Sequence, residues 1–132
     1  GARPVTPEAL GYIEKASRCL AYARTNLDVG LGNDAGRNAY LAAFHAAQAY
    51  IFERTSQIAK SHHGVHTEFS RLAKDDPNIP AQLRRFLAQA YNLKAVADYE
   101  MGPESEVPLD RAEKAINGAR EFVAIIEQRL RA

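Results

Sequence analysis

The residue types that could do chemistry gather in two segments of the sequence. Residues 37–45 contain an arginine, a tyrosine and a histidine, and residues 94–99 contain a lysine, an aspartate and a tyrosine. Arginine and lysine bind phosphate and carboxylate groups, and histidine transfers protons near neutral pH. The two segments therefore suit contact with a phosphate ester such as RNA, or an ion pair between helices.

Arg37 is expected on the packing side of a helix. A helix turns by about 100° per residue, so Arg37 shares a face with Leu41 and Phe44. A buried arginine is costly unless it is paired, so it must meet a carboxylate, a phosphate or the surface. Lys94 and Asp98 stand four residues apart on another apolar stripe. Asp98 is the expected partner of Arg37 if the pairing is internal.

Three of the four histidines, His62, His63 and His66, fall within five residues, and the fourth is His45. His62 and His66 would share one face of a continuous helix, which suits a metal. We expect Gly64 to mark a helix boundary between them, and no glutamate follows His62 as a zinc-protease helix requires. We therefore expect no metal and no cofactor, and interpret these histidines as residues of a polar loop that form hydrogen bonds or line a pocket.

Apolar residues recur at helical spacing in five stretches, and no stretch has the alternation of a strand. The expected helices run from Thr6 to about Gly30, from Asn33 or Asp34 to about Arg54, from about Val65 to Lys74, from Pro80 to about Met101, and from about Leu109 to Leu130. Residues 56–63 and 103–107 are expected to be loops. The fold class is therefore all-α, an antiparallel up-and-down bundle of four to five helices, formed by one domain over residues 1–132.

The composition supports one compact domain and excludes several classes of protein. The chain has 132 residues, of which 46% are hydrophobic and 25% charged, with a net charge of +1. That balance does not indicate nucleic-acid binding by overall charge. No apolar run reaches the roughly 18 residues of a membrane span, and no secretory signal is visible, so we expect a cytoplasmic protein with no membrane contact. The single cysteine, Cys19, excludes a disulfide within the chain.

The second expected helix is rich in alanine at residues 42, 43, 46, 47 and 49. Small side chains let a neighbouring helix approach closely, so this helix belongs in the middle of a bundle. It also has more flat, small surface than a monomer of this size requires. We therefore expect a homodimer in which two copies of the Arg37 groove could form one cleft.

Three segments in order resemble the HEPN (higher eukaryotes and prokaryotes nucleotide-binding) domain family. They are an Arg-Asn-x-Tyr-x-Ala-x-Phe-His-Ala-Ala run at residues 37–47, a Lys-Ser-His-His-Gly-Val-His-x-x-Phe run at 60–69, and Ala-Asp-Tyr-Glu at 97–100. The resemblance spans about residues 8–128. It implies a helical bundle, commonly a homodimer, in a toxin–antitoxin or defence system, with a small nucleotidyltransferase as the antitoxin partner.

The resemblance also implies a chemistry. Many members of the family are metal-independent endoribonucleases, in which an arginine and a histidine separated by four to six residues act together at a dimer cleft. In this chain seven residues separate Arg37 from His45, and the two lie roughly 12 Å apart along a helix. This departure leaves two alternatives open beside a purely structural bundle: an endoribonuclease toxin, or a non-catalytic module that binds a nucleotide or a partner nucleotidyltransferase.

Both alternatives use the same candidate residues. The candidates for catalysis are Arg37, His45, His62 and His63, and the candidates for binding are Asn38, Tyr40, His66, Lys94, Asp98 and Tyr99. In related systems a tyrosine receives adenylate groups, and by that analogy Tyr40 and Tyr99 are the candidates for modification.

Overall fold

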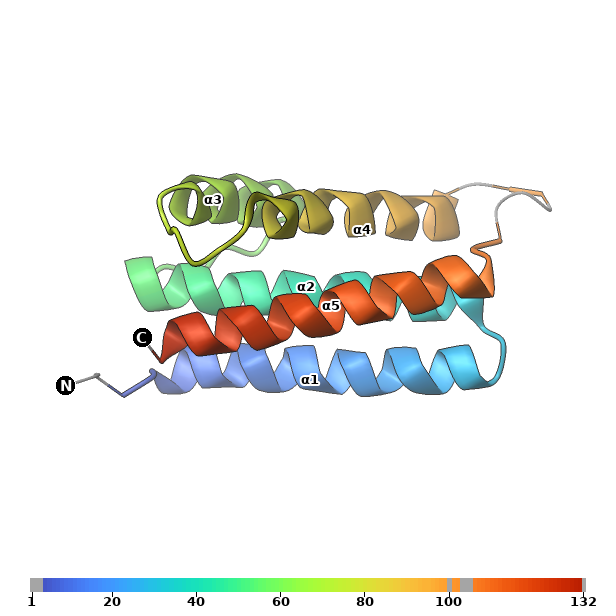
Figure 1. Cartoon of the computed structure of the whole chain (residues 1–132), viewed down its shortest axis with the longest axis horizontal. Helices are drawn as coiled ribbons and strands as arrows, with labels where there is room; N and C mark the ends of the chain where they lie inside the picture. The colour runs from blue at the N-terminus through green and yellow to red at the C-terminus, as the bar shows by residue number, and fades with distance from the viewer. Residues whose placement is uncertain (1–3, 100, 103–105, 132) are drawn as a thin grey trace.

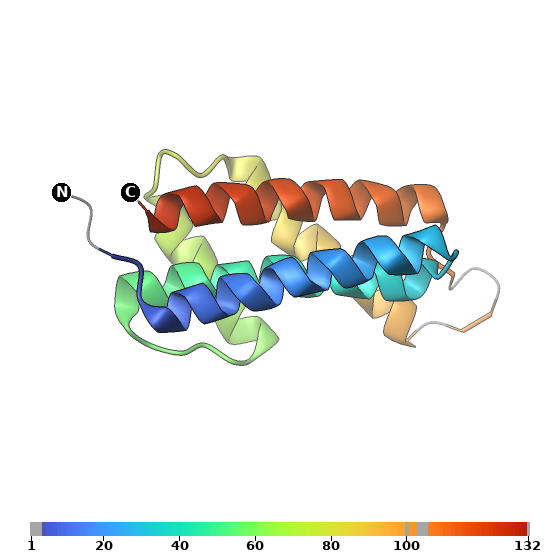
Figure 2. The same ribbon diagram turned by 90° about the horizontal axis from the view of Figure 1, so that it is seen from below.

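A computed structural model describes residues 4–99, 101–102 and 106–131, which form five helices. They are α1 (Pro7–Asp28), α2 (Gly32–Thr55), α3 (His62–Lys74), α4 (Ala81–Tyr99) and α5 (Leu109–Leu130). Figure 1 shows α1 on one side, α2 and α5 in the middle, and α3 and α4 on the other side. Consecutive long helices run in opposite directions, whereas α2 and α5 run the same way (Figure 1), and Figure 2 shows α1 in front of α2 with α5 alongside α1. The expected all-α up-and-down bundle is confirmed.

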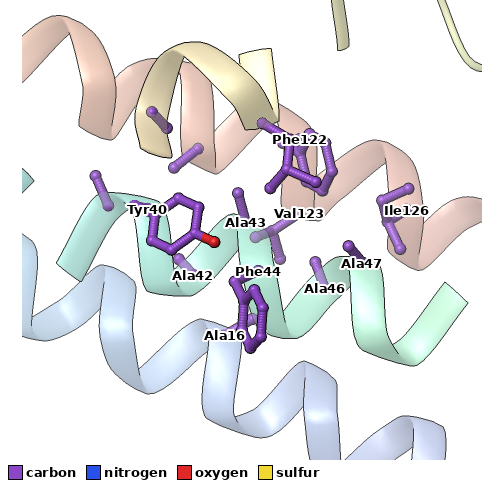
Figure 3. Close-up of a cluster of buried hydrophobic side chains, with 14 of the residues drawn as sticks. Ala16, Tyr40, Ala42, Ala43, Phe44, Ala46, Ala47, Phe122, Val123 and Ile126 are labelled. Atoms are coloured by element: carbon purple, nitrogen blue, oxygen red, sulfur yellow. The ribbon is translucent and has the colours of Figure 1, made fainter. Parts of the chain in front are cut away.

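Helix α2 is the centre of the bundle and packs against each of the other four helices. Its alanines at 39, 42, 43, 46, 47 and 49 have no exposed surface. In Figure 3 Ala42, Ala43, Ala46 and Ala47 lie between α1, which contributes Ala16, and α5, which contributes Phe122, Val123 and Ile126. The small side chains therefore serve packing within one chain, and they give no support to the dimer interface expected from them.

The start of α3 differs from the expectation. The helix begins at His62 rather than near Val65, because the Ser61 hydroxyl caps it by accepting a hydrogen bond from the Gly64 amide at 2.9 Å. Gly64 therefore lies in the first turn of α3 and marks no boundary. The predicted loop over residues 56–63 was wrong at its last two positions, and His62 and His66 share one face of a continuous helix.

The connection between α3 and α4 is fixed by one carboxylate. The side chain of Asp76 is 8% exposed and accepts hydrogen bonds from Tyr50 at 2.9 Å and from Arg129 at 3.0 Å. Arg54 approaches the same oxygen at 3.4 Å. Because these partners belong to α2 and α5, Asp76 fastens the chain after α3 to both central helices.

The start of α2 is held against the segment before α5. The Asn33 side chain accepts a hydrogen bond from the Val107 amide at 2.8 Å. Gly32 lies so close that a Cβ atom there would come 2.2 Å from the Val107 carbonyl oxygen. A larger residue would force the two backbones apart. Most of the loop predicted over residues 103–107 lies outside the described residues. None of the described helices is long and apolar enough to span a membrane.

This close approach gives a test of the fold. We expect Gly32→Ala to lower the free energy of unfolding by roughly 1–3 kcal/mol, because overpacking against a backbone atom cannot be relieved by a rotamer change. Gly11→Ala is the matched control, since Gly11 lies within α1 and nothing would contact its Cβ within 4 Å. That change should raise stability by about 0.5–1 kcal/mol. Urea denaturation followed by circular dichroism measures both, and equal effects of the two changes would contradict the packing.

Candidate functional site

A hydrogen-bonded group of one phenol and two imidazoles lies between α2 and α3. Tyr40, which has no exposed surface, places its Oη atom 2.7 Å from Nδ1 of His62 and 3.0 Å from Nε2 of His66. His62 and His66 reach the same phenol because they lie one turn apart in α3. Tyr91 of α4 packs against all three rings, each at a centroid distance of 5.3 Å.

These imidazoles open onto a pocket of about 290 Å³ lined by His62, His63, His66 and Tyr91. Burial lowers the pKa of His62, and the nearby Lys94 charge lowers it further. Burial is also the main cause of the lowered pKa of His66, followed by the other two histidines. Both rings are therefore neutral at neutral pH, which is the state that a general base requires.

The phenol between the rings stays protonated. Burial, followed by the neighbouring Tyr91, raises the pKa of Tyr40 well above its ordinary value. A protonated phenol can donate one hydrogen bond and accept others. Tyr40 is thus a neutral hydrogen-bonding bridge that does not ionise to a phenolate nucleophile.

An ionic cluster adjoins the pocket. Asp98 on α4 accepts from Arg37 Nε through one oxygen and pairs with Lys94 Nζ at 2.6 Å through the other. Arg37 also pairs with Asp34 of its own helix and donates to the Ala97 carbonyl oxygen at 3.4 Å. The expected Arg37–Asp98 pair is confirmed. Two carboxylates balance two cations, so the Arg37 charge is not free for a ligand.

Lys94 connects this ionic cluster to the pocket. Its side chain is 15% exposed, and its Nζ atom lies 5.9 Å from the centroid of the Tyr91 ring. The hydrogen bond to Asp98 is the main cause of its raised pKa, so Lys94 stays charged. Among the predicted residues, Lys94 is the cation whose charge acts on His62.

The structure places two predicted residues elsewhere. His45 pairs through Nδ1 with the Gln48 side-chain oxygen at 2.8 Å, and Gln48 donates to the Ala59 carbonyl oxygen at 2.9 Å. Burial lowers the pKa of His45, and the Lys15 charge on α1 lowers it as well. Asn38 donates to the Asn26 side chain of α1 at 2.8 Å. Asn38 thus contacts α1, and His45 is linked through Gln48 to the 56–61 segment, so neither residue takes part in the pocket.

The remaining predicted residues differ in access. Tyr99 is 74% exposed at the end of α4, 5.7 Å from Lys94 Nζ, whereas Tyr40 is inaccessible. His63 lies on the rim of the pocket. Sequence reasoning missed Tyr91, although it precedes Lys94 by three residues and so shares its helix face. In the described part of the chain, no group of three or more His, Cys, Asp or Glu residues could hold a metal ion.

One family model matches nearly the whole chain, and two relatives align over most of it. The family model named HEPN domain matches residues 9–129. A Methanocaldococcus jannaschii protein named "Putative toxin MJ0605" is 30% identical over 129 residues, which cover 98% of this chain and 93% of that protein. The UPF0332 protein glr0978 of Gloeobacter violaceus is 26% identical over 121 residues, or 92% of this chain and 94% of that protein.

A solved structure has the same fold. The crystal structure of TT1696 from Thermus thermophilus superimposes with a TM-score of 0.73 and covers 93% of this chain and 98% of that chain, at 24% identity. The match in fold extends over nearly the whole of both chains, so the bundle and the order of its helices are shared.

The ionic cluster predicts a pH dependence of stability. Hydrogen bonds from Lys94 and Arg37 hold the pKa of Asp98 below its ordinary value of 3.8. Its stabilising effect is therefore complete above about pH 5 and is lost as the pH falls through the lowered pKa. Asp98→Asn should destabilise the protein at pH 7, and the difference from the wild type should shrink toward pH 2.

Asp28→Asn is the control, because Asp28 pairs with Arg24 on the surface, with side chains 59% and 49% exposed. Such pairs contribute little, so its effect should be small at each pH. A loss of stability in Asp98→Asn that stays the same from pH 7 to pH 2 would contradict the ionic role of Asp98. Thermal denaturation across this pH range makes the comparison.

Proposed function

The chain belongs to the HEPN domain family, and from this premise we propose that it is a toxin that cleaves RNA without a metal ion at the pocket of His62 and His66. One observation carries the proposal: two neutral imidazoles, hydrogen-bonded to one buried phenol, open onto the same pocket. The name of the 30% identical M. jannaschii protein supports the toxin part of the proposal.

The chemistry follows from the residues at the pocket. One neutral imidazole removes the proton of an RNA 2′-hydroxyl, which attacks the adjacent phosphorus, and the pair of imidazoles returns one proton to the departing 5′-oxygen. Lys94 lies beside this position and attracts the negative charge that develops on the phosphate. The products are a 2′,3′-cyclic phosphate and a 5′-hydroxyl, and no metal ion takes part.

This proposal changes the roles of two residues. Arg37 binds Asp98, which binds Lys94, so Arg37 positions the lysine and does not contact RNA. His45 contacts Gln48 and has no part in the reaction. The departure from the family's arginine–histidine spacing is therefore compatible with cleavage, because the histidines of α3 supply the proton transfer.

A second candidate function is a non-catalytic module that binds a nucleotide at the same pocket. The charge balance of the ionic cluster favours it, because Asp34 and Asp98 offset the charges of Arg37 and Lys94. A pocket with little uncompensated positive charge binds a polyanion weakly. Binding of one nucleotide would then rest on Tyr91, the histidines and Lys94.

The partners belong to the proposal as well. A small nucleotidyltransferase would act as the antitoxin. It could reach Tyr99 directly, because that side chain is 74% exposed. Leu31, Met101 and Leu109 expose apolar surface at the same end of the bundle, where α1 meets α2 and α4 leads into α5. This end, and not the alanines of α2, is the proposed contact for an antitoxin or a second copy of the chain.

Incubation of the purified protein with a defined RNA, with and without EDTA, tests the function. We expect cleavage that EDTA does not inhibit, and a reduction of roughly 100-fold or more in His62→Ala. His45→Ala is the matched control, since it removes a half-buried histidine outside the pocket, and it should cleave within a few-fold of the wild type. Thermal melting of each variant excludes loss of folding.

Two results would overturn the proposal of cleavage. One is equal loss of activity in the two histidine variants, and the other is the absence of cleavage together with a raised melting temperature in the presence of ATP. The latter would favour the nucleotide-binding module.

A further inference from the structure

The contact of Tyr40 with two imidazoles constrains where their protons lie. A phenol has one proton to donate, while its oxygen can accept from other donors. Tyr40 Oη is within hydrogen-bonding distance of Nδ1 of His62 and of Nε2 of His66. When both imidazoles are neutral, the phenol can donate to only one of them. The other imidazole must then donate to the phenol oxygen if both hydrogen bonds are made.

This constraint gives the two rings opposite hydrogen-bonding roles toward Tyr40. The imidazole that accepts from Tyr40 carries its own proton on its outer nitrogen, the one that does not face the phenol. The imidazole that donates to Tyr40 has a lone pair on its outer nitrogen. Because His62 and His66 both line the pocket, the pair holds one acid and one base at the same time.

The surroundings keep the phenol in this role. Tyr40 is fully buried on the central helix, so no water competes for its proton. Tyr91 contributes a ring contact, Lys94 and Asp98 are the charged groups of α4 that act on His62, and His63 lies beside the pair on α3. Of these groups, Lys94 and His63 disfavour a charge on the imidazoles, whereas Asp98 favours it.

We propose that His62, Tyr40 and His66 act as one proton relay, in which Tyr40 is a positioning residue that passes a proton between the two histidines. The catalytic use of this relay rests on the proposed function, but the coupling of the two rings does not. In the proposed function, the base of the pair takes the proton of the RNA 2′-hydroxyl.

The proton transfers balance. The outer nitrogen of the base takes the 2′-hydroxyl proton, and the inner nitrogen of the same ring gives its proton to Tyr40 Oη. Tyr40 gives its original proton to the inner nitrogen of the second ring, whose outer nitrogen protonates the 5′-oxygen. The bond from the 2′-oxygen to phosphorus forms as the bond from phosphorus to the 5′-oxygen breaks. Each ring ends as its other tautomer, and the two rings have exchanged the roles of donor to Tyr40 and acceptor from it.

The relay also limits how many protons the pair can take up. The first added proton occupies the outer lone pair of the donating ring and leaves both hydrogen bonds to Tyr40 intact. A second added proton has no free nitrogen, so it must displace the hydrogen bond from Tyr40 to the accepting ring. The two histidines are therefore expected to titrate in two well separated steps, the second of them at clearly lower pH.

Nitrogen-15 NMR of the histidine rings tests the coupling without any RNA. In the wild type at pH 7.5, His62 and His66 should show one ring protonated toward Tyr40 and the other protonated on its outer nitrogen. Tyr40→Phe keeps the ring but removes the bridging oxygen, and both histidines should then populate a mixture of tautomers. His45, whose Nδ1 faces Gln48, is the internal control and should not change.

The pH profile of RNA cleavage is the second readout. In the wild type the neutral pair contains both an acid and a base, so the rate should be flat from neutral pH down to the first protonation step. In Tyr40→Phe the rings titrate separately, so the profile should become bell-shaped and kcat should fall at least tenfold at pH 7.5. DNA of the same sequence should not be cleaved.

The outcomes separate this inference from the proposed function. One ring protonated toward Tyr40 and the other on its outer nitrogen, which means the same tautomer on both rings (both Nδ1–H or both Nε2–H), would support the coupling, and in a protein that does not cleave RNA it would overturn the proposed function. Cleavage that depends on His62, together with different tautomers on the two wild-type rings (one Nδ1–H and the other Nε2–H) or an unchanged pH profile in Tyr40→Phe, would overturn the relay. The wild-type spectrum alone decides the coupling even if Tyr40→Phe fails to fold.

Discussion

The burial of α2 on every side is the constraint on which the rest of the structure depends. Its alanines allow four helices to approach it, which removes almost the whole helix from water. Polar groups that are buried need partners within the protein. The polar side chains along α2 are therefore bound to different parts of the chain, and those bonds determine how the other elements sit.

The hydrogen-bond partners of the α2 side chains lie on several other elements. Arg37 reaches Asp98 of α4, Tyr40 reaches α3, Gln48 reaches the segment before α3, and Tyr50 reaches the connection after it. Near the end of the helix, Glu53 accepts from the Thr6 hydroxyl at 2.8 Å, which joins α2 to the cap of α1. Helix packing alone leaves rotation and sliding undetermined, and these polar contacts fix them.

The sequence was sufficient for the features that depend on local periodicity and on charge balance. Helical spacing predicted α5 at Leu109–Leu130, and the cost of a buried arginine predicted the bond from Arg37 to Asp98. The sequence was insufficient where one residue pattern is consistent with two different structures. Small residues on α2 are needed for close helix packing whether the neighbour belongs to the same chain or to a second one.

The α3 histidines show a different limit. A glycine after two histidines is typical of a turn, but Ser61 turns the same residues into a capped first helical turn. Tyr91 has the sequence character of a core residue, and its ring does pack among other rings. Its place at the pocket depends on how α4 crosses α3, which no local pattern contains.

The need of buried polar groups for hydrogen-bond partners also accounts for the arrangement of side chains at the pocket. Tyr40 cannot leave its hydroxyl unpaired inside the bundle, and the nearest partners on α3 are two imidazoles one turn apart. Removing these rings from water lowers their pKa, so they remain neutral and able to exchange protons. On α2, by contrast, Arg37 and His45 lie on different sides of the helix and are held by unrelated partners. The requirement that positions a stable core thus also places two neutral imidazoles side by side on α3, and the proposed chemistry therefore rests on α3 rather than on α2.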